Sequence, residues 1–358
     1  MKNLMQKKGK YRKWITCFVA GMFMMLFLFG CGEVRNQEPD GEADREEAEE
    51  EEKLRIVASN FPCYDFARAI TGGKAEITML IPPGNEVHSY EPTPQDMVTI
   101  GNCDLFLYTG GESDEYIEEI LDSFSHRSFH TIKIMDFVTL YEEETIEGMQ
   151  VRGQSHDHDS VEPAYEDCED YEEDAAKQSQ AHEEEYDEHV WTSPKNAIRI
   201  IKGMEEVISL MDQENAQFYE EHAEHYVEQI SNLDKRFEKL FENSKEQALF
   251  VGDRFPFLYF AKEYGITYYA VFPGCNGESE PSARTMAFFI EKAREYEAKT
   301  IFYLELSNSQ TAQAVAEAIG ADSGELHSCH NVTKEDFFNG VTYVELMERN
   351  YRRLKEVF

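Results

Sequence analysis

Positive charge is scarce in this chain of 358 residues, which has 34 lysines and arginines against 71 aspartates and glutamates. The formal net charge of −37 argues against a nucleic-acid partner, because phosphate binding depends on lysine and arginine side chains that displace counterions. An acidic surface is instead suited to gathering cations.

Paired cysteines and catalytic zinc motifs are also missing. The seven cysteines are widely scattered and none forms a CxxC pair, so we predict no essential disulfide. No HExxH motif or comparable helical motif occurs. Because catalytic zinc needs an open coordination position beside a general base, we expect a binding protein rather than a metal-dependent hydrolase.

The apolar segment near the start of the chain is too short for a transmembrane helix. It runs without a charge from Trp14 to Phe29 and follows a basic segment, whereas a helix that spans a bilayer takes roughly 20 apolar residues. We therefore predict a signal peptide over residues 1–31. Gly30 before Cys31 resembles a bacterial lipobox, which implies export and a lipid anchor at Cys31 on the extracytoplasmic face of the cell membrane. An ordinary signal peptide or an uncleaved anchor is the alternative.

Two acidic segments contain too few apolar residues to form a core. Residues 32–53 are almost wholly acidic and are expected to form a disordered tether. Residues 152–188 are rich in Asp and Glu and contain His156, His158 and His182, which predicts a mobile loop. Imidazoles in such a loop can bind additional metal weakly, and a disordered solubilising insertion is the alternative.

The remaining sequence alternates between strand and helix patterns. Strand-like runs occur at residues 54–59, 75–81, 103–110, 247–252, 266–272 and 299–306, and helical periodicity occurs between them. From Asn196 to Asn243, apolar residues at spacings of three and four predict a long amphipathic helix, broken mildly at MDQENA. We therefore expect an α/β protein with an N-terminal lobe (54–211), a long rigid linking helix (212–245), a C-terminal lobe (246–358) and a cleft between the lobes.

Two histidines stand in rigid segments at the edges of the first lobe. His88 lies in PPGNEVHSYEPTPQD among four prolines, and His189 lies in EHVWTSPKNA just before a helix start marked by Ser193 and Pro194. Each histidine alone is more often structural than a ligand. Two of them, in rigid turns of an exported acidic protein, favour a shared metal site.

These motifs, together with MDQENA, EPSA at residues 280–283 and the terminal GVTYVELMERNYRRLKEVF, resemble the ZnuA-like and TroA-like solute-binding lipoproteins of zinc and manganese ABC importers. The resemblance covers nearly everything after Lys53. It implies two lobes bridged by a rigid helix, with a metal in the cleft held by His88, His189 and two side chains from the second lobe.

The second-lobe ligands depart from the family pattern. Arg254 stands where zinc binders have histidine and manganese binders glutamate, and it has no lone pair to donate. We therefore predict that Asp253 is a ligand and that Arg254 orients it. The alternative is that Asp253 only caps the following helix or pairs with Arg254. For the fourth ligand we choose His330, with Cys329 and His327 behind it, and Glu305 is a further alternative, whereas Cys275 is interpreted as a plain loop thiol.

The predicted set of three imidazoles and one carboxylate favours Zn²⁺, with Mn²⁺ as the alternative, because Mn²⁺ prefers a larger share of oxygen ligands. The resemblance implies a receptor, expected to be a monomer, that captures Zn²⁺ and delivers it to an ABC permease in the membrane. A manganese-specific lipoprotein or a surface metal-binding adhesin is the alternative.

Overall fold

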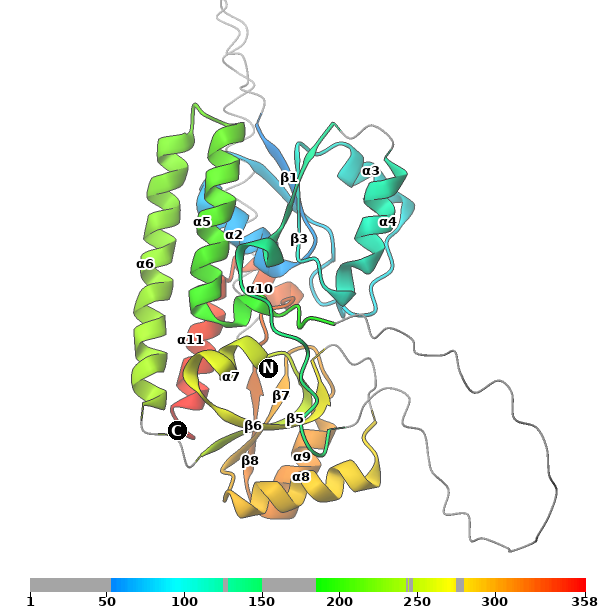
Figure 1. Ribbon diagram of the computed structural model, residues 1–358, viewed down its shortest axis with the longest axis vertical. Coiled ribbons are helices and arrows are strands. Elements are labelled where there is room, and N and C mark those ends of the chain that lie inside the picture. The colour runs from blue at the N-terminus through cyan, green and yellow to red at the C-terminus, as the bar shows by residue number, and fades with distance from the viewer. Residues whose placement is uncertain (1–52, 125–127, 150–184, 243, 245–246, 275–279) are drawn as a thin grey trace, which may run out of the picture. The chain divides into compact units, whose positions relative to one another are not determined.

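Two parallel sheets of four strands each form the framework of the protein (Figure 1). The computed structural model describes residues 53–124, 128–149, 185–242, 244, 247–274 and 280–358. The predicted signal peptide, the tether up to residue 52 and the acidic loop up to residue 184 lie outside these residues.

The two sheets share one topology. The first has the strand order β2-β1-β3-β4 and the second β6-β5-β7-β8, and all the pairings are parallel. The strands of the first sheet are β1 (Arg55–Ala58), β2 (Glu76–Met79), β3 (Leu105–Tyr108) and β4 (His130–Lys133). Those of the second sheet are β5 (Ala248–Phe255), β6 (Thr267–Pro273), β7 (Thr300–Leu304) and β8 (Asp322–Leu326). The prediction of two α/β lobes is confirmed.

Helices cover both faces of each sheet, which explains why the central strands β1, β3, β5 and β7 are largely apolar. Ile56 faces a core shared with α2 (Phe61–Thr71) and α5 (Pro194–Met211), whereas its neighbour Val57 faces α3 (Pro94–Gly101) and α4 (Glu115–Ser123). In the second sheet, Leu249 joins the first core and Phe250 packs with α8 (Ala283–Glu295) and α9 (Gln310–Ile319). One core therefore continues through both lobes.

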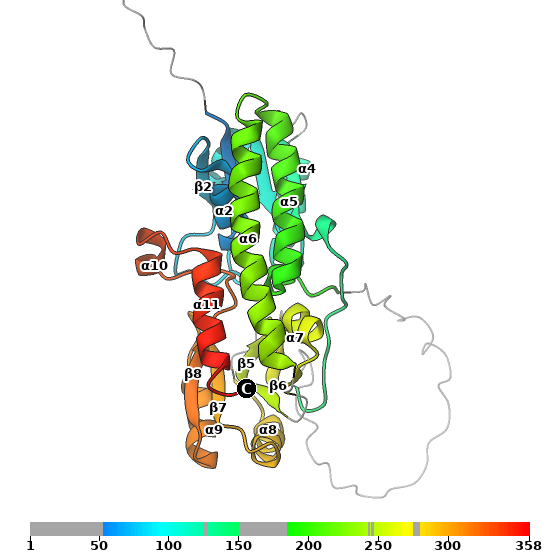
Figure 2. The same cartoon turned by 90° about the vertical axis from the view of Figure 1, so that its left-hand side faces the viewer.

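A helical hairpin replaces the single long helix that the sequence predicts from Asn196 to Asn243. The helices α5 and α6 (Ala216–Phe241) lie side by side, and the chain turns between them (Figure 2). The turn is fixed by the Asp212 carboxylate, which accepts hydrogen bonds from Asn215 Nδ2 at 2.9 Å and from the Tyr219 hydroxyl at 2.5 Å. The MDQENA segment thus reverses the chain.

The helix α6 connects the two lobes, as the sequence predicts for this region. Near its middle, the Tyr226 hydroxyl donates to Asp65 of α2 at 2.5 Å. At its end, Phe241 packs against Phe260 of α7 (Leu258–Tyr264) and against the terminal Phe358, with ring centroids 5.8 and 4.9 Å apart. The same helix therefore packs against elements of both lobes.

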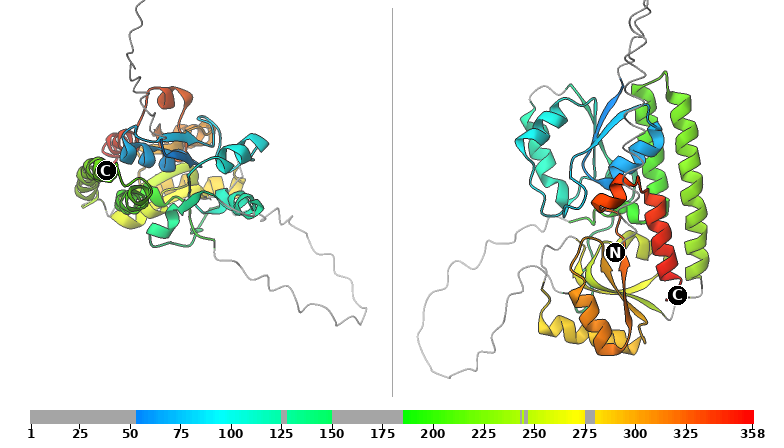
Figure 3. Two further views of the ribbon diagram at one scale, coloured as in Figure 1. Left: turned by 90° about the horizontal axis from the view of Figure 1, so that it is seen from above. Right: turned by 180° about the vertical axis from the view of Figure 1, so that it is seen from behind.

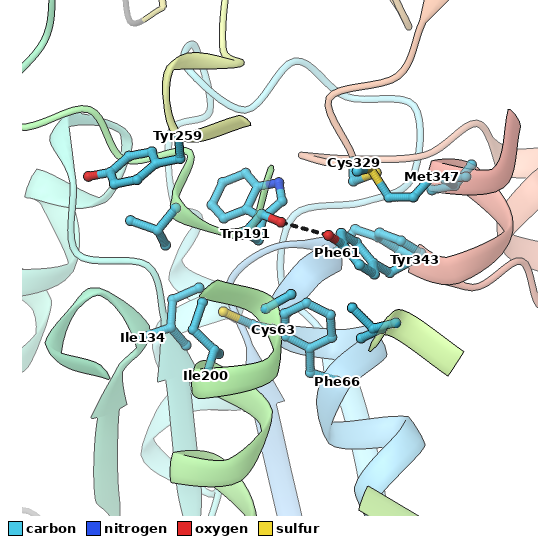
Figure 4. Close-up of a cluster of buried hydrophobic side chains, with 14 of the residues drawn as sticks. Phe61, Cys63, Phe66, Ile134, Trp191, Ile200, Tyr259, Cys329, Tyr343 and Met347 are labelled. Carbon is cyan, nitrogen blue, oxygen red and sulfur yellow. Dashed lines mark hydrogen bonds between the residues drawn. The ribbon is translucent and has the colours of Figure 1, made fainter. Parts of the chain in front are cut away.

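The C-terminal helices return to the first lobe. The helix α11 (Tyr343–Leu354), which follows α10 (Lys334–Phe338), lies beside α6 (Figures 2 and 3). The Tyr343 hydroxyl donates to the Trp191 carbonyl at 2.8 Å within a cluster of buried hydrophobic side chains (Figure 4). On its other side, Trp191 Nε1 donates to the Ser328 carbonyl at 2.8 Å. The segment around Trp191 is thereby fixed from both sides.

No helix within the described residues combines the length and apolar character needed to cross a membrane.

Candidate metal centre

Three histidines from separate segments meet where the carboxyl ends of the strands give way to loops. His88 lies in the loop after β2, His189 precedes the short helix η3 (Val190–Thr192), and His330 follows β8. One ligand atom of each lies within 4.8 Å of the others and of a carboxylate oxygen of Glu188. The crevice at the carboxyl ends of parallel strands is the usual ligand site of open α/β sheets.

The hydrogen bonds of Ser113 fix the tautomer of His88. The Ser113 hydroxyl donates to Glu188 Oε1 at 2.5 Å and lies 2.8 Å from His88 Nδ1. A hydroxyl has a single hydrogen, and Ser113 donates it to Glu188. Ser113 Oγ therefore accepts the hydrogen bond from His88 Nδ1–H. His88 Nε2 then keeps its lone pair for a metal ion.

A buried carboxylate orients His189 in the same way. Asp187 Oδ1 lies 3.2 Å from His189 Nδ1 and accepts the backbone N–H of His189 at 2.8 Å. Because an ionised carboxylate only accepts, Nδ1 carries a proton, which leaves Nε2 as the ring nitrogen that could bind a metal ion. Metal-binding histidines commonly donate their second nitrogen to a carboxylate, which fixes the ring.

His330 presents an unpartnered nitrogen to the group. Its Nε2 is buried without a hydrogen-bond partner among the described residues and lies 3.7 Å from Glu188 Oε1. The ring centroid of His330 lies 4.8 Å from that of Trp191 and 5.1 and 5.0 Å from those of His88 and His189. A buried polar atom without a partner costs free energy, and a bound metal ion would remove that cost.

Glu188 is the carboxylate of the group, and its side chain is fully buried. Its Oε2 accepts the backbone N–H of Ser113 at 2.8 Å, and its Oε1 lies 3.7 Å from both His88 Nδ1 and His330 Nε2. Burial raises the pKa of Glu188 above its usual range, against the influence of His189 and Ser113.

The electrostatic environment keeps two of the three imidazoles neutral. Burial lowers the pKa of His88 and His330 well below its usual value, and neighbouring histidines and Arg254 act in the same direction. Burial also acts to lower the pKa of His189, but Asp187 and Glu188 outweigh it and raise the value. Metal binding requires neutral imidazole, so His88 and His330 are ready to bind at ordinary pH.

A small cavity of about 30 Å³ adjoins the three histidines. Its other wall is formed by residues of the second lobe and of the loop before His88, among them Glu86, Arg254 and Glu305. A space of this size holds about one or two water molecules. The cavity thus matches an ion with little remaining hydration.

Asp253 does not join the group. Its Oδ1 accepts the backbone N–H of Arg254 at 2.8 Å, and it is not one of the four residues whose ligand atoms lie within 4.8 Å of one another. The expected pairing is corrected as well, because the Arg254 guanidinium donates two hydrogen bonds to Glu86, at 3.1 and 3.0 Å, whereas its Nε is 3.9 Å from Asp253. The register of β5 shifts between Val251 and Arg254, an irregularity that the sequence does not reveal.

The alternative second-lobe residues have other roles. Glu305 lines the cavity, but its carboxylate accepts the backbone N–H and the hydroxyl of Ser328, and burial raises its pKa to about 7. His327 Nδ1 accepts the backbone N–H of Cys329 at 2.9 Å, and neither residue belongs to the group of four converging ligand residues. Cys275 lies outside the described residues. The three described cysteines, Cys63, Cys103 and Cys329, are free and buried.

Sequence reasoning missed Glu188 and its neighbours. It assigned Asp187 and Glu188 to the mobile acidic loop, whereas both side chains are buried against the histidines. The signal was their position directly before His189, since a carboxylate beside a metal-binding histidine often orients or joins the site. Ser113, in a turn after β3, gave no comparable signal.

Known proteins resemble this chain over nearly its whole length. The profile of a family described as zinc-uptake complex component A, periplasmic, matches residues 56–357. The chain is similar to the high-affinity zinc uptake system protein ZnuA of Bacillus subtilis, with 29% identity over 97% of this chain and 98% of that protein.

Two further similarities concern AdcA of Streptococcus pneumoniae. The chain is 27% identical to this zinc-binding lipoprotein over 96% of its own length, but it spans only 61% of AdcA. The crystal structure of the Zn(II)-bound ZnuA-like domain of AdcA superposes with a TM-score of 0.65 at 25% identity, covering 85% of this chain and 98% of that domain.

Proposed function

Because this chain belongs to the zinc-uptake complex component A family, we propose that it captures Zn²⁺ outside the cytoplasm and delivers it to an ABC permease for import. The family comprises solute-binding receptors for zinc transport, so the prediction that the protein is not an enzyme is confirmed. In this proposal zinc is the ion that is transported and not a resident cofactor.

The observation that carries the proposal is the convergence of three imidazoles and one buried carboxylate within 4.8 Å. We assign His88, His189 and His330 as ligands through nitrogen and Glu188 as the fourth ligand, in place of Asp253. The orphaned Nε2 of His330 and the hydrogen bonds that fix His88 and His189 support this set. Nitrogen-rich four-ligand sites suit Zn²⁺.

Manganese is the second candidate cargo, and the donor set argues against it. Mn²⁺ favours oxygen ligands and higher coordination, whereas three of the four donors here are imidazoles.

A surface metal-binding adhesin is the alternative role. An adhesin needs no permease, so loss of zinc-limited growth on deletion would favour import, and loss of adhesion alone would favour the alternative.

The membrane location belongs to the same proposal. Lipid attachment at Cys31 would hold the receptor, acting as a monomer, at the extracytoplasmic face beside the permease. AdcA is named a lipoprotein, which supports this assignment. Cys31 lies outside the described residues.

Zinc titration of the full chain and of three single variants tests the site. We expect one tight Zn²⁺ per chain, and His88→Ala, His189→Ala and His330→Ala should each weaken binding by more than the roughly 10- to 100-fold typical of groups that only orient a ligand. The control is His130→Ala, since His130 is exposed on β4. Parent-like affinity in the three site variants, or tighter binding of Mn²⁺ than of Zn²⁺ by the parent, would contradict the proposal.

A further inference from the structure

The forked ion pair between Arg254 and Glu86 joins the two lobes beside the metal centre. Arg254 Nη1 and Nη2 donate to the two carboxylate oxygens of Glu86, at 3.1 and 3.0 Å. Arg254 lies in β5 of the second lobe, and Glu86 lies two residues before His88 in the first. Such two-pronged pairs are stronger and more directional than single hydrogen bonds.

The pair lines the cavity beside the three histidines and also reaches solvent. Both side chains line the cavity at the three histidines, yet Arg254 is 14% exposed and Glu86 is 38% exposed. Glu86 and Asn85 also line a separate surface depression of about 650 Å³, whose wall includes the acidic side chains of Glu91 and Asp96. Glu86 and Asn85 therefore line both spaces.

The backbone beside the pair is anchored. Asn331 Nδ2 donates to the carbonyls of Pro82 and Asn85, both at 2.9 Å, and the N–H of Gly84 donates to the Val332 carbonyl at 2.8 Å. These bonds attach the loop before His88 to the second lobe. The freedom to open a path between depression and cavity therefore lies with the side chains.

We propose that the Arg254–Glu86 pair is a side-chain gate that sets the rates at which zinc enters and leaves the site. The closed pair separates the cavity from the surface depression, and its separation opens the path for the ion. Arg254 takes no part as a ligand, since guanidinium has no lone pair to donate. This inference rests on the proposed function, because it assumes that zinc binds at the three histidines.

A purely electrostatic effect of the two charges makes a different prediction. Removing the positive charge of Arg254 would favour zinc, and removing the negative charge of Glu86 would disfavour it. By contrast, removing either side chain of the ion pair breaks the pair, so both variants would open a gate to the same extent. Arg254→Ala and Glu86→Gln should therefore change the kinetics in the same direction if the pair is a gate, and in opposite directions if only charge matters.

The test is stopped-flow measurement of zinc binding by the full chain in a Trp14→Phe background. Trp191 is then the only tryptophan, and its ring lies 4.8 Å from that of His330, so its emission reports on the site. Release is measured by mixing the zinc-loaded protein with an excess of chelator. The matched control is Arg349→Ala. Arg349 forms a similar two-pronged ion pair with Asp336, with hydrogen bonds of 3.1 and 2.7 Å, and neither residue lines the cavity.

We expect Arg254→Ala and Glu86→Gln each to raise both the association and the dissociation rate constants by about tenfold, as for loss of a charge-assisted pair. The equilibrium affinity should change by much less, and Arg349→Ala should match the parent. Opposite effects of the two variants, or parent-like rates in Glu86→Gln, would overturn the gate while leaving zinc binding intact. A parent that binds no zinc would overturn the proposed function and the gate together.

Discussion

Each imidazole of the metal centre has a defined environment. His88 and His189 use one ring nitrogen for a hydrogen bond, to Ser113 and Asp187, and keep the other for the ion. His330 Nε2, within the same group, has no hydrogen-bond partner in the described part of the chain. In the proposed site the donors are therefore oriented before zinc arrives, which lowers the entropy lost on binding.

Two single variants test whether Glu188 or Asp253 supplies the carboxylate ligand. Glu188→Gln keeps the shape of the side chain but removes its charge, so we expect zinc affinity to fall about 10- to 100-fold. Asp253→Asn should bind zinc like the parent, because its carboxylate contacts its own chain neighbour and not the histidines. Isothermal titration of both variants measures the difference, and the opposite ranking would restore Asp253 as a ligand.

Sequence pattern could locate the histidines but not the carboxylate. His88 and His189 stand in rigid, proline-marked segments, and His330 lies near the position that the family resemblance implies. Which of several acidic side chains meets them depends on the β5 irregularity and on burial of the end of the acidic loop. Those are tertiary properties, and the ligand roles themselves stay predictions.

The turn between α5 and α6 is the element that sequence periodicity missed. Apolar spacing of three and four continues across both helices, so periodicity alone did not distinguish a mild break from a reversal. The distinction comes from Asp212, which binds Asn215 and Tyr219 across the turn. Strand patterns were more reliable for the apolar strands than for β4 and β8, whose exposed polar residues hide the signal.

Asp212→Ala should destabilise the hairpin by about 1 kcal/mol in the free energy of unfolding, a modest value because the site is partly exposed. Burial acts to raise the pKa of Asp212, but the hydrogen bonds from Tyr219 and Asn215 outweigh it and lower the pKa. The stabilisation is therefore present above the unfolded pKa of about 3.9 and lost as pH falls through the lower folded value.

Urea unfolding at pH 7 and at decreasing pH measures this effect. The difference between parent and Asp212→Ala should shrink as the pH falls below about 4. Glu214→Ala is the control, since Glu214 is exposed in the same turn. A difference that stays constant with pH would show that the Asp212 charge contributes nothing.

At the scale of the folded unit, two sheets of the same topology place their carboxyl-terminal loops around one site. Sequence alternation was enough to predict two α/β lobes and a connecting helix, because each strand and helix carries its own pattern. It could not predict which side chains of the two lobes contact each other beside the site. That depends on long-range contacts such as Trp191 with Ser328 and Arg254 with Glu86.

The most direct test of the account is a crystal structure of the zinc-loaded protein with anomalous data collected on both sides of the zinc absorption edge. We predict one strong zinc peak in the interlobe cavity, about 2.0–2.1 Å from a nitrogen of each of His88, His189 and His330 and about 2.0–2.2 Å from an oxygen of Glu188. A zinc peak bound instead by Asp253, Glu305 or Cys329, or no peak at the three histidines, would contradict the central claim.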